Sequence, residues 1–266
     1  MKKCLVLGCS HSAGSYVSYS DKAEFPETID TVKGYYSFID IPDIEYTVYA
    51  VSNGGYLNFA KIIANMLSSD IFQPGEIGNF DFVLIQETFE PRILMTNNNP
   101  EWKLNDKVEN LKHHHLLPHE EVINFAHRPE SKEEVKVDQT FIWDRHNVEY
   151  KNNKKLMDWW IQVVKDNSAK GYLWLITKSA ITYINHVLQR LNIPCYILSW
   201  HQGTNFIAKP FHTWCRYLNL PLLERVIYKN LDFYVYHEDK NYIGHATING
   251  NKEIGKLLTK ELKEVL

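Results

Sequence analysis

The chain alternates short apolar runs with longer segments whose apolar residues recur at helical spacing. Four runs have the length of a strand, at residues 3–7, 46–51, 82–85 and 195–198. The first is apolar between its ends, which is typical of a strand buried on both faces of a parallel sheet. A fifth, shorter strand is expected at residues 233–236.

Helices are predicted between and after these strands. Apolar residues at helical spacing favour helices at 57–67, 156–164 and 172–191, and an amphipathic helix over 254–265. Residues 35–39 have the pattern of a short helix. Strands that alternate with helices indicate an α/β protein.

Residues 91–150 break this pattern, because they are polar and have few periodic apolar positions. Structureless segments of this length are uncommon inside compact domains unless they are functional, so we expect an insertion over the edge of the active site. Its aromatic residues are candidates either for a sugar-binding cleft or for the core. Three of its histidines are adjacent and cannot all face one ion, so we expect a surface or self-packed cluster and no metal. The cluster comprises the adjacent His113, His114 and His115, together with His119 and His127.

Composition sets further limits. With 266 residues, of which 44% are hydrophobic, the chain has the material for one domain (1–266) with an insertion. Its net charge of -3 argues against a nucleic-acid partner. Four scattered cysteines give no support to a zinc or disulfide framework. No apolar leader or run of about 18 apolar residues is present, so we expect no membrane partner and a cytoplasmic protein as synthesised.

The turn after the first strand, residues 8–14, carries the leading candidate for a nucleophile. Ser10 stands where the carboxyl end of that strand is expected, and open α/β sheets bind ligands at this edge. The turn lacks the Lys-Ser/Thr of a P-loop and the second glycine of a dinucleotide fingerprint. Ser12 replaces the second glycine of the G-x-S-x-G elbow of α/β-hydrolases.

Two blocks at opposite ends of the chain resemble those of the SGNH (GDSL-type) hydrolase family. Gly8, Ser10 and Gly14 have the spacing of its first block, G-D-S-x-x-x-G, with a cysteine in place of the aspartate. His245 and Gly250 have the separation and the near-terminal position of its last block, D-x-x-H-x-x-x-x-G. The resemblance implies a nucleophilic Ser10 and a general base His245.

The catalytic acid of that last block is open. Tyr242 stands where the family has its aspartate. Asp239, six residues before the histidine, is the nearest carboxylate, with Glu238 and Asp232 behind it. Alternatively, a backbone carbonyl orients the imidazole of a Ser-His dyad.

The middle blocks imply the oxyanion hole and the substrate contacts. By the resemblance, the amides of Ser10 and Gly55 hold the oxyanion, with Gly54 as the near equivalent of Gly55. The third block lacks the usual Asn. It looks instead like the Q-W-T variant of some phage-associated members, in which Thr88 or Arg92 is a candidate for the missing donor. The substrate-binding candidates are Arg92, Gln86 and His11.

The resemblance implies a three-layer α/β/α sandwich, flavodoxin-like, with a parallel sheet of about five strands and the insertion. It implies a serine esterase without a cofactor, whose small-molecule or glycan substrate carries an ester such as O-acetyl. A phage origin would make the protein virion-associated. The alternatives are a degenerate SGNH-fold protein that binds glycans or has a structural role, and a nucleotide-binding flavodoxin-like protein.

Overall fold

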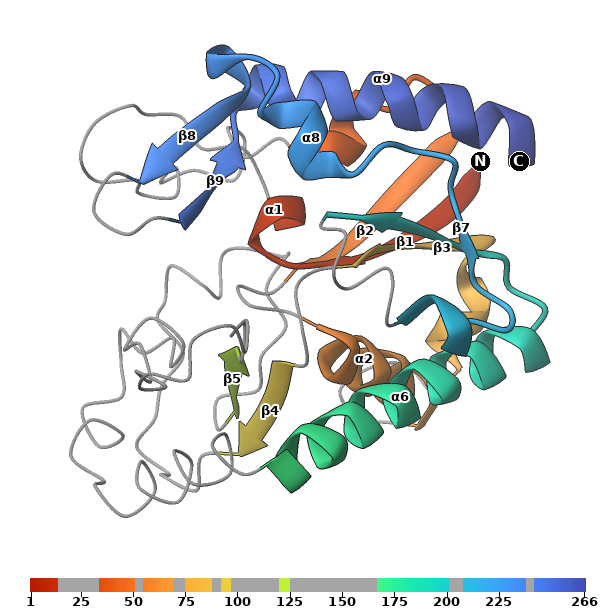
Figure 1. Cartoon of the computed structure of the whole chain (residues 1–266). Helices are drawn as coiled ribbons and strands as arrows, with labels where there is room; N and C mark the ends of the chain where they lie inside the picture. Colours follow the sequence, from red (N-terminus) through yellow and green to blue (C-terminus); the bar gives the residue numbers. More distant parts are fainter. Residues whose placement is uncertain are drawn as a thin grey trace.

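A computed structural model of the chain is shown in Figure 1. It describes residues 1–13, 34–50, 55–68, 75–87, 92–96, 120–124, 167–200, 208–237 and 242–266. The predicted helix at 156–164 and most of the predicted insertion lie outside these residues. That the chain forms a single domain stays a prediction.

The centre of the molecule is a five-stranded sheet in the order β2-β1-β3-β6-β7, in which every neighbouring pair is parallel. Its strands are β1 (Lys2–Gly8), β2 (Ile44–Ala50), β3 (Phe82–Glu87), β6 (Cys195–Ser199) and β7 (Arg216–Tyr217). The predicted α/β class and the parallel sheet of about five strands are confirmed.

The central strands are covered on both faces. Residues 4–7 of β1 are wholly buried, and because side chains alternate along a strand, Leu5 and Leu7 join one core cluster while Cys4 and Val6 join the other. Each cluster includes helical residues from its own side of the sheet. The fold therefore has three layers, as Figure 1 shows.

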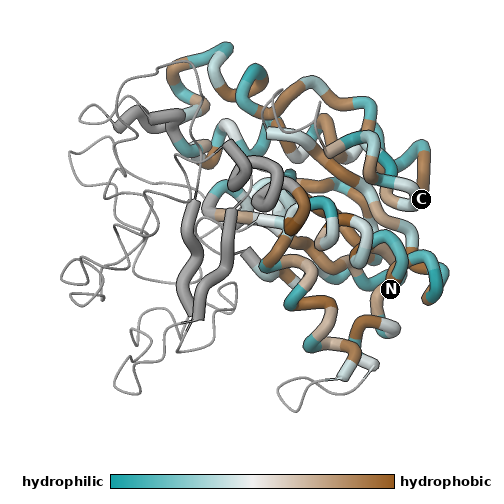
Figure 2. The backbone as a smooth tube through the Cα atoms, turned by 60° about the horizontal axis from the view of Figure 1, so that its bottom comes forward, coloured by the Kyte–Doolittle hydropathy of each residue, from teal (hydrophilic) through white to brown (hydrophobic). Residues whose placement is uncertain are grey.

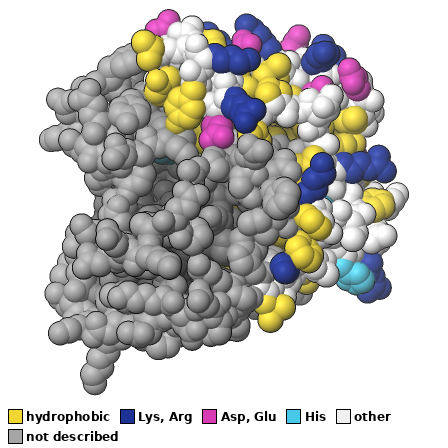
Figure 3. All heavy atoms as spheres, in the orientation of Figure 1, with side chains coloured by type: hydrophobic (Ala, Val, Ile, Leu, Met, Phe, Trp, Pro, Cys, Tyr) yellow, Lys and Arg dark blue, Asp and Glu magenta, His cyan; other side chains and the backbone are white. Residues whose placement is uncertain are grey.

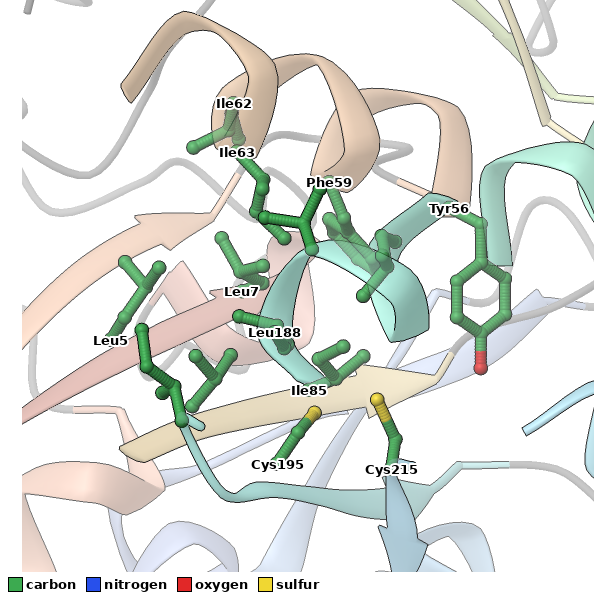
Figure 4. Packing of buried hydrophobic residues seen from close by; sticks show 14 of the residues in the cluster. Leu5, Leu7, Tyr56, Phe59, Ile62, Ile63, Ile85, Leu188, Cys195 and Cys215 are labelled. Atoms are coloured by element: carbon green, nitrogen blue, oxygen red, sulfur yellow. The ribbon is translucent and has the colours of Figure 1, made fainter. Parts of the chain in front are cut away.

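One face is packed by α2 (Tyr56–Ser68) and α6 (Asn167–Arg190), which also contact each other. Figure 4 shows Phe59 and Ile63 of α2 above the strand residues Leu7 and Ile85, with Leu188 of α6 in the same cluster. Tyr56 lies at one end of this cluster, so its ring joins the core and its hydroxyl lies at the rim.

The other face is packed by the 3₁₀ turn η2 (Tyr35–Phe38), α8 (Leu223–Ile227) and α9 (Ile248–Val265). The amphipathic C-terminal helix and the short helix near residue 35 are thus found where the sequence predicts them. In Figure 2, hydrophobic and hydrophilic residues alternate along the described helices, so each helix has a side suited to the sheet.

The strand predicted at residues 233–236 is present, but it does not belong to the main sheet. Residues 234–237 form β8 (Tyr234–His237), which pairs antiparallel with β9 (Tyr242–Ala246) outside the main sheet. The fifth strand of the main sheet is β7, whose two residues are too few to show a periodic pattern. A second antiparallel pair, β4 (Arg92–Thr96) and β5 (Glu120–Asn124), lies within the expected insertion.

Short elements complete the described part. They are α1 (Ser10–Ala13), η3 (Glu76–Asn79), η4 (Lys209–Phe211) and η5 (Leu231–Phe233). On the face shown in Figure 3, Lys and Arg side chains are interspersed with Asp and Glu over the described residues. Among the described helices, none combines the length and the apolar composition that crossing a bilayer demands.

We predict that Gly255→Ala destabilises the protein. A Cβ at Gly255 would lie 2.6 Å from the Cβ of Phe38 and 2.8 Å from its backbone carbonyl carbon, where α9 packs on η2. Such overpacking costs about 1–3 kcal/mol, which exceeds the gain of about 1 kcal/mol in helix propensity. Urea denaturation should therefore show a lower free energy of unfolding.

Gly78→Ala is the control, because no atom lies within 4 Å of a Cβ built at Gly78 in η3. Its free energy of unfolding should stay within about 0.5 kcal/mol of wild type. Equal stability of Gly255→Ala and wild type would contradict the described packing of α9 on η2.

Candidate active site

The strand order places the candidate site between β1 and β3. The chain runs from β1 to β2 on one side of it and then crosses to β3 on the other, so the order reverses at this point. In open α/β sheets, ligands bind outside the carboxyl ends of the strands at such a switch point. The residues at this position are those that follow β1, from Cys9 to Ser12, and the last two of β3, Gln86 and Glu87.

The first turn is tightly closed. Ser12 N–H donates to the Cys9 carbonyl at 2.8 Å, and a Cβ at Gly8 would overlap the Ser12 side chain, so only glycine fits there. The backbone of Ser10 begins α1, directly at the switch point. The structure describes this residue by its backbone only.

A buried hydrogen-bond chain ties this turn to β3. The Ser12 hydroxyl donates to Gln86 Oε1, so it accepts from the hydroxyl of Tyr35 at 2.9 Å, and the thiol of Cys9 donates to the same Gln86 oxygen at 3.8 Å. Burial raises the pKa of Tyr35, which keeps its hydroxyl protonated as a donor. Gln86 Nε2 is buried and has no hydrogen-bond partner among the described residues. Gln86, predicted as a substrate contact, thus anchors the first turn through its oxygen.

Three aromatic rings meet beside this turn. His11 stacks on Trp200, with ring centroids 3.7 Å apart and an interplanar angle of 20°. It also stacks on His245, at 4.4 Å and 25°. His245 lies on β9 and is partly buried, where the sequence predicted a loop. The fold therefore brings His245 beside the residue that follows Ser10, although 234 positions separate His11 from His245 in the sequence.

The second block forms a helix cap. Gly55 precedes α2, and its N–H donates to Asn58 Oδ1 at 3.2 Å while its carbonyl accepts from Phe59 N–H. The Asn58 side chain thus satisfies one of the backbone N–H groups that a helix N-terminus leaves without an intrahelical partner. An oxyanion would therefore have to compete with Asn58 for the hydrogen of the Gly55 amide.

The remaining predicted site residues are not brought together by the described part of the structure. Gly54, Thr88 and Asp239 lie outside the described residues, and Arg92 is described only by its backbone in β4. Gly250 lies in the first turn of α9 and donates its N–H to Thr247 Oγ1 at 3.2 Å, which caps the helix that follows His245.

A second polar cluster, centred on Glu87, lies on the opposite face of the sheet from Gln86, because successive residues of a strand point to opposite sides. The Glu87 carboxylate is wholly buried. It accepts from Tyr56 at 2.7 Å, from Tyr217 at 2.9 Å and from Ser199 at 2.7 Å. Burial raises the pKa of Glu87, although the three hydroxyl donors oppose this shift.

The Glu87 cluster continues to His212. Because the hydrogen of Tyr56 goes to Glu87, His212 Nε2 donates to the Tyr56 oxygen at 3.0 Å, and Nδ1 accepts from the amide of Asn185 at 3.3 Å. The oxygen of Asn185 accepts the backbone N–H groups of Trp214 and Cys215. These roles require a neutral imidazole, and burial lowers the pKa of His212 to about 4.

Sequence reasoning missed the Glu87 cluster and Trp200. One signal was available: Gln86 and Glu87 extend an apolar run without a turn residue between, which indicates polar side chains carried into the core. Trp200 follows β6 directly, at the same edge of the sheet. The stacking of Trp200 on His11 could not be predicted from the sequence, because it depends on how two separate elements approach each other.

Within the described residues, no three His, Cys, Asp or Glu side chains come together as a metal site. All four cysteines are buried and free of disulfides. No protein-family model matches the chain, and no curated protein is similar to it. The resemblance to SGNH hydrolases therefore depends on the residues of its blocks.

We predict that His212 lowers the free energy of unfolding of the protein in acid. In the folded protein the pKa of His212 is about 4, below its ordinary value of 6.5. Between pH 4 and 6.5, therefore, His212 is protonated in the unfolded chain and neutral in the folded one. The free energy of unfolding that this group contributes is present above pH 6.5 and is lost as pH falls through 4, by about 3 kcal/mol in all. Chemical denaturation at several pH values measures it.

His212→Gln is the test variant. It should be less stable than wild type at pH 7, because the bonds to Tyr56 and Asn185 are weakened, but it should lose less stability between pH 6.5 and 4. A variant with the wild-type pH slope would contradict the neutral buried imidazole.

Proposed function

We propose that the chain is a serine esterase of the SGNH type, in which Ser10 is the nucleophile and His245 the general base. The observation that carries the proposal is the stack of His245 on His11, next to Ser10 at the switch point of the sheet. An imidazole beside a serine on the ligand-binding edge of an α/β sheet suits acyl transfer.

The proposed reaction has two steps. His245 takes the Ser10 hydroxyl proton as the oxygen bonds to the ester carbonyl carbon, and it returns that proton to the departing alcohol as the ester bond breaks. A water molecule then attacks the acyl-enzyme, gives a proton to His245 and releases the acid, while Ser10 regains its proton. Acetyl esters of carbohydrates are the proposed substrates.

The oxyanion contacts of the proposal follow from the first two blocks. The Ser10 N–H lies at the start of α1, so it is the leading donor. Gly55 would share its amide with Asn58, which makes the Gly54 amide the stronger second candidate. Thr88 and Arg92 follow β3 in the sequence and are the candidates for a side-chain donor.

In this proposal, the His245 imidazole is oriented either by the carboxylate of Asp239, which completes a triad, or without a carboxylate, in a dyad. Asp239 belongs to the four residues between β8 and β9, the strand that carries His245. In a triad, Asp239→Asn should lower kcat by about 10²-fold or more. In a dyad, its kcat should stay within about threefold of wild type.

A glycan-binding protein with a degenerate site is the second candidate. It is favoured by the engagement of the Gly55 N–H with Asn58, which leaves one oxyanion donor fewer. This candidate predicts that acetylated oligosaccharides bind without being hydrolysed.

We predict that Ser10→Ala lowers the hydrolysis of p-nitrophenyl acetate by at least about 10³-fold, because it removes the nucleophile. A fluorophosphonate should label wild type at Ser10, as located by mass spectrometry of the peptides. Ser37→Ala changes an exposed serine and is the matched control, with wild-type activity expected.

His245→Gln should lower kcat by about 10²-fold or more, whereas His186→Gln, on the exposed side of α6, should not change it. Labelling or turnover that persists in Ser10→Ala would refute the nucleophile. Absence of turnover in wild type, together with glycan binding, would favour the second candidate.

A further inference from the structure

We infer that His11 is a positioning residue, which holds the His245 imidazole in the orientation needed to take the Ser10 proton; this rests on the proposed function. A general base acts efficiently only when a further group fixes its ring. The His245 ring stacks on the His11 ring, with centroids 4.4 Å apart and an interplanar angle of 25°. A ring stacked in this way can slide or turn only by losing its contact.

His11 is itself fixed from its other face. Two near-parallel rings at 3.7 and 4.4 Å cannot share one face of an imidazole, so Trp200 and His245 cover opposite faces. His11 is accordingly only 6% exposed. With both faces covered, His11 is poorly placed to bind substrate, and its effect on the reaction passes through His245.

The platform beneath His11 is rigid. Trp200 is wholly buried, its backbone N–H donates to the Glu87 carbonyl at 3.1 Å, and its backbone carbonyl accepts from Glu224 N–H at 3.2 Å. The backbone of Trp200 is thus attached to the end of β3 on one side and to α8 on the other, and the indole is held by burial. Residue 12, which follows His11, is held by Gln86 and Tyr35. Both the ring and the backbone of His11 are therefore fixed.

The stack also suits the charge that forms in the reaction. When His245 accepts the Ser10 proton, its positive ring faces a neighbouring aromatic face, and a cation over such a face is stabilised. The flat shape of residue 11 is what both effects need. A planar ring without nitrogens should serve, and a branched side chain of similar volume should not.

The test compares His11→Phe, His11→Leu and His11→Ala with wild type. His11→Leu fills the space without a flat ring, and we expect kcat for p-nitrophenyl acetate to fall about 10–100-fold with KM within about threefold, because misplaced groups cost rate. His11→Ala should behave likewise. His11→Phe should recover most of the wild-type kcat. His186→Leu, on the exposed side of α6, is the control with unchanged kcat.

Thermal denaturation of each variant separates positioning from unfolding, and kcat is compared only at temperatures where all variants are folded. A folded His11→Leu with wild-type kcat would overturn the inference. So would a folded His11→Phe as impaired as His11→Leu, since a ring nitrogen rather than the ring would then be needed.

A second measurement needs no activity. In protein labelled with ¹³C-histidine, the His245 ring protons, assigned by their loss in His245→Gln, should be shifted by the ring currents of the stack. His11→Leu should reduce this shift and His11→Phe should keep it. If wild type does not hydrolyse esters, the proposed function fails. The ring shifts alone then decide whether His11 holds His245, and an unchanged shift in His11→Leu would refute it.

Discussion

The burial of β1 and β3 between two helical layers is the constraint on which the described structure depends. Residues 4–7 of β1 and the whole of β3 are wholly buried, so the polar residues at the ends of these strands enter the interior with them. A buried polar group is costly unless it is hydrogen-bonded. At the carboxyl edge, two clusters provide such hydrogen bonds on opposite faces of the sheet, one around Gln86 and one around Glu87.

The end of β3 couples these two clusters. The Gln86 side chain holds the first turn, while the neighbouring Glu87 organises three hydroxyl groups, and its backbone carbonyl accepts from Trp200. The three hydroxyl donors thus compensate the burial of the Glu87 carboxylate. The same strand end thereby fixes Trp200, on which His11 stacks, and so connects the core of the sheet with the candidate active site.

In the candidate site, a contact that restrains the His245 imidazole is a stacked ring, which differs from the carboxylate of a catalytic triad. A carboxylate fixes an imidazole by a directed hydrogen bond to one nitrogen, whereas a stack fixes the plane of the ring. The two are compatible, so the stack accords with either a triad through Asp239 or a dyad. The sequence suggests His11 as a substrate contact, and the structure shows its ring buried and stacked on both Trp200 and His245.

Apolar periodicity alone predicts the α/β class, the four long strands of the sheet and its main described helices, because it reports the burial of each element. The sequence also singled out Ser10 and His245 from their spacing to glycines. Three features become visible only in three dimensions: β7 completes the sheet, β8 pairs with β9, and His11 lies between Trp200 and His245. Strand pairing and ring stacking depend on which elements distant in the sequence contact each other, and local apolar periodicity does not specify these contacts.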